Sequence, residues 1–120
     1  MSPRDNKLDS LSEAFRPLAM RFLARLVEAR VPVVIVETRR SEEAHQEDLR
    51  NGRSWIQRSK HQDGNAIDVC PYAQYDLHGP DKLQWNPAHP VWPTIAITAE
   101  KCGLKSGYRW KQKDCGHVEL

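Results

Sequence analysis

Two short windows, one in the middle of the chain and one at its C-terminal end, constrain the fold more than any other feature of the sequence. The first covers residues 59–68 (SKHQDGNAID) and the second covers residues 114–120 (DCGHVEL). Together they supply two histidines and an aspartate, which are ligand types that zinc prefers, and a spare carboxylate. A fold that brings the two windows together would therefore build a metal site.

Four residues of these windows suggest what kind of site it is. His61, Asp68 and His117 are the candidate metal ligands, and Asp114 lies three residues before the last of them. Three protein ligands leave one coordination position open, as in catalytic zinc sites, whereas structural sites are closed by four. A carboxylate beside such a centre can take a proton from the water that the metal activates. The windows therefore indicate a metallohydrolase with one Zn²⁺ as its cofactor.

The alternation of side chains shows how the two windows can meet. Residues 66–70 are predicted to form a strand after a turn, with apolar side chains on one face and Asp68 on the other. Residues 116–120 show the same alternation, which directs His117 away from the core. If the two strands are neighbours, Asp68 and His117 lie on one wall, and His61 joins them from the preceding loop.

The same residues carry a family resemblance. The pattern S-x-H-x-x-G-x-A-x-D, followed by D-x-G-H-x-E-L, resembles the zinc D-alanyl-D-alanine carboxypeptidases and their hedgehog-like relatives. It is most similar to the L-alanyl-D-glutamate endopeptidases of phage lysis systems, which end in a string much like residues 114–120. A third segment, Arg40-Ser41 at the head of a predicted helix, resembles the Arg-Ser/Thr segment of this family. The resemblance covers roughly residues 31–120.

Residue roles follow from this resemblance. It implies that His61, Asp68 and His117 bind zinc and that Asp114 is the general base. It also makes Arg40 the cation that stabilises the oxyanion. Arg39 directly precedes Arg40, which leaves the choice between the two arginines open, and we expect Arg40 to face the zinc.

Three further residues are candidates for a supporting or substrate-binding role. Ser59 either hydrogen-bonds near the site or only shapes the turn. Glu119 shares the face of His117, so it either orients that ligand or forms a salt bridge at the chain end. Trp110 leads into Asp114 and either lines a groove or packs in the core. The remaining histidines are expected at the surface rather than at a metal: His45, His78 and His89.

The three cysteines are odd in number and cannot all pair within a monomer, which suits a reducing compartment. Cys70 or Cys115 as an additional zinc ligand is the alternative to simple packing near the site. If Asp68 and His117 are directly opposed, Cys70 lies opposite Cys115, and oxidation outside the cell could join them.

The remaining pattern predicts an alternation of helices and strands. Helices are expected over residues 10–29, 41–50 and 92–101, and further strands over residues 31–36 and 104–110, the first of them buried because it is an almost continuous β-branched run. A capping box at Ser10 would start the first helix, and Pro17 would either kink that helix or mark a second start. Residues 71–93 read as a long loop, a candidate wall of the substrate groove. The family resemblance implies an α+β fold, with a small antiparallel sheet backed by helices and the zinc site on its open face.

Composition sets outer limits. At 120 residues, the chain is expected to form a single catalytic domain over residues 1–120. The net charge of +2 is too small to indicate nucleic acid as a partner. No apolar run approaches the roughly 20 residues that span a bilayer, and residues 1–7 lack the apolar core of a signal peptide. We therefore expect a monomer that is made in the cytoplasm and reaches the cell wall after holin-type release.

These observations favour a zinc-dependent peptidoglycan hydrolase, a phage or prophage endolysin that cuts the L-Ala-D-Glu bond of the stem peptide. A D-alanyl-D-alanine carboxypeptidase or dipeptidase is the alternative within the same class. A zinc-binding module without catalysis, as among hedgehog-like relatives, is the alternative of another class. Asp114 argues against that module, because a pure binding site needs no base.

Overall fold

The computed structural model describes residues 5–52, 59–72 and 83–120. Its helices and strands alternate along the chain in the predicted order: α1 (Arg16–Glu28), β1 (Val33–Glu37), α2 (Glu42–Arg50), β2 (Ala66–Pro71), α3 (Trp92–Lys101), β3 (Lys105–Ser106) and β4 (His117–Glu119). Short 3-10 turns lie at η1 (Leu8–Ser10), η2 (Lys60–Asp63) and η3 (Gly107–Arg109). The predicted α+β class is confirmed.

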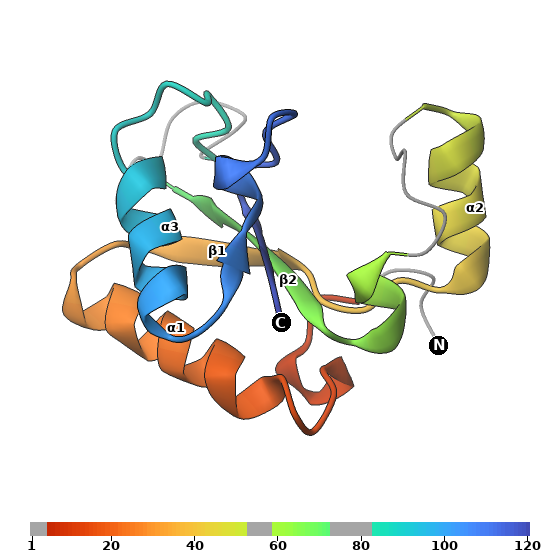
Figure 1. The fold of residues 1–120 in the computed structure, drawn as a ribbon, viewed down its shortest axis with the longest axis horizontal. Helices are drawn as coiled ribbons and strands as arrows, with labels where there is room; N and C mark the ends of the chain where they lie inside the picture. The colour runs from red at the N-terminus through yellow and green to blue at the C-terminus, as the bar shows by residue number, and fades with distance from the viewer. Residues whose placement is uncertain (1–4, 53–58, 73–82) are drawn as a thin grey trace.

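The strands form one antiparallel sheet in the order β1-β2-β4-β3. Asp68 on β2 is directly opposite His117 on β4, which meets the condition under which the sequence places both side chains on one wall. Because the pairing is direct, the two windows of the sequence meet at the centre of the sheet (Figure 1).

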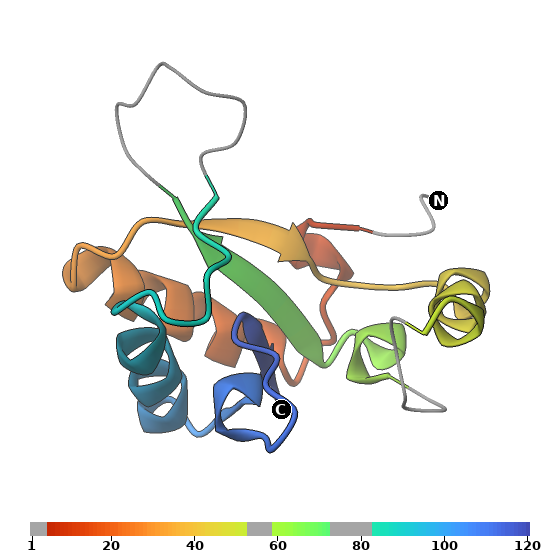
Figure 2. The same cartoon turned by 90° about the horizontal axis from the view of Figure 1, so that it is seen from above.

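Helices α1 and α3 lie side by side against the sheet and enclose the core, whereas α2 stands apart at the other end of the molecule (Figures 1 and 2). The side chains that fill this core are fully buried and come from both helices and the two central strands: Phe15, Phe22, Leu26, Ile67, Val69, Trp92, Ile95 and Val118. Asp68 and His117 lie on the other face of the sheet, away from this core, where polar side chains can gather. No helix among the described residues has the length and apolar character needed to cross a bilayer.

Three local predictions are wrong. Helix α1 begins at Arg16 with Pro17 in its first turn, so Pro17 marks the start and Ser10 is not its cap. Strand β1 lies at the edge of the sheet. It is not a buried strand, since Val34 and Val36 remain 40% and 39% exposed. The strand expected over residues 104–110 is limited to β3, and the turn η3 follows it directly.

The predicted loop over residues 71–93 is described only at its two ends, since residues 73–82 lie outside the described part of the chain. Tyr72 and Leu83 form an isolated antiparallel bridge there. The role of the loop over residues 71–93 as a wall of the substrate groove stays a prediction.

Candidate metal centre

His61 is positioned by the short turn η2. Ser59 accepts a hydrogen bond from the backbone N–H of His61 at 3.2 Å, while the side chain of Gln62 accepts one from the backbone of Ser59 at 2.8 Å. This reciprocal capping box sets the direction of the turn. Ser59 therefore shapes the turn that presents His61, which is one of the two roles considered for it.

A β-bulge at the end of β1 places two consecutive residues beside that turn. The register between β1 and β2 shifts between Ile35 and Glu37, which brings Glu37 opposite Asp68. Glu37 and the following Thr38 are both buried, at 6% and 0% exposure. The main-chain carbonyl of Thr38 then accepts a hydrogen bond from Nδ1 of His61 at 2.8 Å. Bulges are common next to functional sites, and here the residues that follow the bulge supply the carbonyl that His61 contacts.

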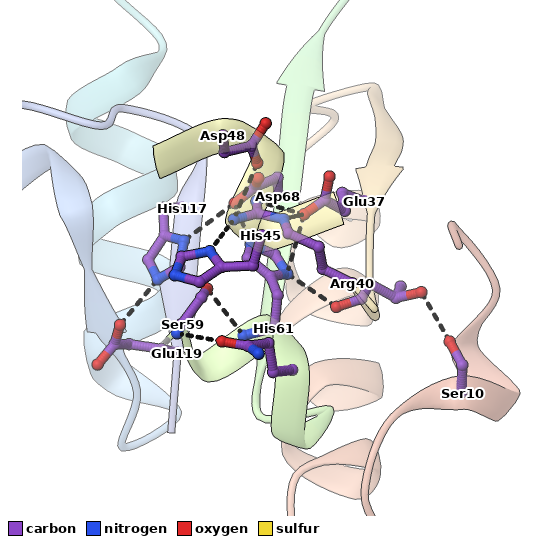
Figure 3. Close-up of polar contacts among 12 residues, drawn as sticks. Ser10, Glu37, Arg40, His45, Asp48, Ser59, His61, Asp68, His117 and Glu119 are labelled. Atoms are coloured by element: carbon purple, nitrogen blue, oxygen red, sulfur yellow. Dashed lines mark hydrogen bonds and ion pairs between the residues drawn. The ribbon is translucent and has the colours of Figure 1, made fainter. Parts of the chain in front are cut away.

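The three predicted ligands converge on one point (Figure 3). Oδ1 of Asp68 lies 3.1 Å from Nε2 of His61 and 3.1 Å from Nδ1 of His117. The candidate donor atoms all lie within 4.8 Å of one another. Donors bound to a tetrahedral zinc at about 2.0–2.2 Å are separated by roughly 3.3 Å, so these spacings suit a divalent metal.

The ring nitrogens that point away from the shared oxygen of Asp68 are Nδ1 of His61 and Nε2 of His117, and their hydrogen bonds also support a metal site. A carbonyl can only accept, so Nδ1 of His61 donates to Thr38 and Nε2 of the neutral ring carries a lone pair. Among the described residues, that buried Nε2 has no hydrogen-bond partner, although Oδ1 of Asp68 lies 3.1 Å from it. On the other ring, Nε2 of His117 lies 2.8 Å from Oε1 of Glu119. Ligand histidines typically hold their second nitrogen in this way, and the residues therefore fit a metal ion.

The electrostatics of the centre are those of a site that holds positive charge. Burial alone would raise the pKa of Asp68, but its contacts with His117 and His61 hold it well below its usual range. Burial alone would lower the pKa of His117, but its bonds to Asp68 and Glu119 raise it to about 9. Without metal, a proton occupies the space between Asp68 and His117 that a cation would otherwise take.

Asp114 lies at the exposed edge of the centre, with about half of its side chain accessible. Its Oδ2 is 4.0 Å from Nδ1 of His117, near the ligands but outside their group. Its backbone is held by hydrogen bonds to Gly107 and from His117, at 3.0 and 3.1 Å. Partial burial and the charge of Asp68 raise the pKa of Asp114. A carboxylate of this kind is better suited to accept a proton than an ordinary surface aspartate.

Of the two candidate arginines, Arg40 lies on the side of the centre and Arg39 is exposed. The Nε of Arg40 donates to Glu37 at 2.7 Å, and its NH1 lies 3.4 Å from Asp48. Its backbone N–H also donates to the carbonyl of His61. Arg40 is therefore tied both to the ligand turn and to a buried acidic pair.

Sequence reasoning missed most of the network around Arg40. His45 is fully buried with Nδ1 3.4 Å from Arg40, so its prediction as a surface residue is wrong. Asp48 lies three residues on, along the same face of α2, which Ser41 caps as predicted. The three-residue spacing of His45 and Asp48 in a helix that begins after Ser41 places both side chains on one face, and this spacing could have indicated their proximity from the sequence. His89 is half-buried and accepts a bond from the backbone of Val91, and His78 lies outside the described residues.

Trp110 lies against the centre rather than in the core. Its ring centroid is 5.0 Å from that of His117, with an angle of 44° between the planes. The ring of His61 meets the same His117 at 5.1 Å and 78°. Trp110 is partly exposed and so forms one side of the environment of His117.

The cysteines are all free thiols. The ladder between β2 and β4 ends at Asp68 and His117, and beyond it the N–H of Val69 donates to the carbonyl of Gly116. Cys70 is buried in the core, and Cys115 packs against that core. The opposition of Cys70 and Cys115 stays a prediction. Within the described part of the chain, the group that could hold a metal contains no cysteine.

Comparison with known proteins adds independent findings. The model of a family described as phage L-alanyl-D-glutamate peptidase matches residues 2–120. Among solved structures, the chain is similar to that of the Serratia marcescens L-Ala D-Glu endopeptidase ChiX, with 26% sequence identity and a TM-score of 0.73. This similarity covers 94% of the present chain and 82% of the other. No curated protein matches the sequence.

Proposed function

Since this chain belongs to the phage L-alanyl-D-glutamate peptidase family, whose members act on peptidoglycan, we propose that it cuts the stem peptide with a Zn²⁺ held by His61, Asp68 and His117. The observation that carries the proposal is the buried Nε2 of His61, which lies near Asp68 and has no hydrogen-bond partner in the part of the chain that the structure describes. A metal ion is the partner that would satisfy both atoms and the inner nitrogen of His117.

The bound metal would supply Lewis-acid chemistry, polarising the scissile carbonyl and making water acidic enough to ionise near neutral pH. Asp114 would accept the proton from that water and deliver it to the leaving amine. Its position 4.0 Å from His117 and its raised pKa support this role. About half of the Asp114 side chain is exposed, so a substrate in the site can reach the carboxylate.

Arg40 would place positive charge near the oxyanion that forms during the reaction. Such charges act most strongly when they are held in place before the reaction begins. The bonds of Arg40 to Glu37 and Asp48 provide that restraint, and its link to the carbonyl of His61 keeps it next to the ligand turn. Trp110 would then contact the substrate beside His117.

The product of digestion tests the proposed bond. Purified cell wall incubated with the enzyme should yield muropeptides with a new amino-terminal D-Glu, detected by mass spectrometry. Loss of only a terminal D-Ala would instead indicate a D-alanyl-D-alanine carboxypeptidase, and unchanged muropeptides would indicate a binding module. A monomeric state and release by a holin stay predictions.

A further inference from the structure

We infer that the N-terminal segment, residues 5–12, is a positioning element of the metal centre that acts on His61 through Thr38. The inference rests on the metal role proposed for His61. It concerns residues that are far from both windows in the sequence, and the contact of this segment with His61 runs through Thr38.

Thr38 is the link, because all three of its polar groups are engaged. Its carbonyl accepts from Nδ1 of His61 at 2.8 Å. Its N–H donates to the carbonyl of Asp5 at 2.6 Å, and its hydroxyl lies 2.7 Å from that of Ser10. The N-terminal segment thus holds two groups of Thr38 while His61 binds the third.

The direction of the hydroxyl bond can be assigned. Ser10 Oγ donates its only proton to the carbonyl of Lys7 at 2.7 Å. Ser10 must therefore accept from the hydroxyl of Thr38, which has no other hydrogen-bond acceptor among the described residues. Ser10 and Asp5 thus hold the hydroxyl and the N–H of Thr38, while its carbonyl accepts from His61.

A second set of contacts braces the other end of the ligand turn. The N–H of Ser12 donates to the carbonyl of Gly64 at 2.9 Å, and its hydroxyl bonds to Asn65 at 2.5 Å. Gly64 has φ of 72°, and a Cβ there would lie 2.9 Å from both the carbonyl of Ser10 and the nitrogen of Ser12. Glycine therefore allows the N-terminal segment to lie directly against the end of η2.

Thr38 is fully buried, so water cannot replace a lost hydroxyl bond without rearrangement. Loss of the Ser10 contact should let the Thr38 carbonyl shift and free the ring of His61 to rotate. Partners of this kind on the outer nitrogen of a ligand histidine typically contribute 10–100-fold to metal affinity. Because Ser10 acts one bond further away, we expect an effect at the lower end, about tenfold.

The test measures zinc affinity by chelator competition in Ser10→Ala, Thr38→Val and the double variant. Each single change should weaken zinc binding about tenfold, and the double variant should be no weaker than either, since both remove the same contact. Thr38→Ser keeps the hydroxyl and should retain normal affinity. Thr98→Val is the matched control, because it removes a threonine hydroxyl bond within α3, far from the centre.

A second readout does not depend on the metal. In the metal-free protein, the ¹⁵N shifts of the His61 ring should report a proton held on Nδ1, and this signature should weaken in Ser10→Ala. If the wild type binds no zinc, the metal proposal fails while these shifts still decide the inference. Unchanged shifts and zinc affinity within twofold of the wild type in folded Ser10→Ala would overturn it.

Discussion

Oε1 of Glu119 lies 2.8 Å from Nε2 of His117, the ring nitrogen that points away from Asp68. The carboxylate therefore holds the ring so that Nδ1 faces the centre. Of the two roles considered for Glu119, this geometry favours the orientation of the ligand.

Replacement of Glu119 should consequently weaken metal binding. Glu119→Ala is expected to raise the dissociation constant for zinc about 10–100-fold, and Glu119→Gln less, because the amide oxygen still accepts a hydrogen bond. Glu100→Ala is the matched control, since Glu100 pairs with Arg109 at the surface. Chelator competition gives the constants, and equal values for Glu119→Ala and the control would contradict the assignment.

Asp114→Asn should separate catalysis from metal binding. Asparagine keeps the shape of the side chain, and residue 114 lies outside the group of candidate ligands, so the zinc content should remain at the wild-type level. Activity should fall about 10²–10⁴-fold, the usual contribution of a general base. Metal analysis beside a muropeptide assay checks both, and a loss of zinc in this variant would identify Asp114 as a ligand instead.

The two arginines should differ sharply. Arg40→Lys keeps the charge but not the planar fork that meets Glu37 and Asp48, so kcat should fall about 10²–10³-fold. Arg39→Ala, at the exposed neighbour, should leave kcat within about twofold. Thermal unfolding controls for loss of structure, because Arg40→Ala would also remove a cation from beside two buried carboxylates. A larger loss of kcat in Arg39→Ala would reverse the assignment.

Metal binding should release a proton. The pKa of His117 is raised to about 9 in the metal-free protein, so its ring carries a proton at pH 7.5 that a metal must displace. The sign for stability is that of a raised histidine: the stabilisation of the metal-free protein is present below the unfolded pKa of about 6.5 and is lost as pH rises through about 9. Calorimetry at pH 7.5 in buffers of different ionisation enthalpy should give about one proton released per zinc. A value of zero would show that His117 is already neutral.

The faces of Asp68 and His117 could be predicted because the alternation of side chains along a strand is a local property of the sequence, whereas the pairing of their two strands was only a condition. The limits of α2 and α3 were equally accessible, since Ser41 and the apolar spacing of residues 92–101 mark them locally. The three candidate ligands, which the structure brings together, came from the motifs in the two windows.

The surroundings of His61 could not be predicted in the same way. The burial of Glu37 and Thr38 follows from a β-bulge at the end of β1, and no residue type in that strand predicts the bulge. Ser10 fits a capping box by its spacing, but its hydroxyl bonds to Lys7 and Thr38, contacts that depend on the tertiary fold. Long-range contacts of this kind compete with local preference and are visible only in the folded chain.

The zinc content of His117→Ala, measured beside that of the wild type after purification in trace zinc, tests the central claim most directly. A centre built from His61, Asp68 and His117 predicts about one zinc per chain in the wild type, and in the variant a loss of most of the metal together with the peptidase activity. Undiminished stoichiometric zinc in a folded, active His117→Ala would contradict it.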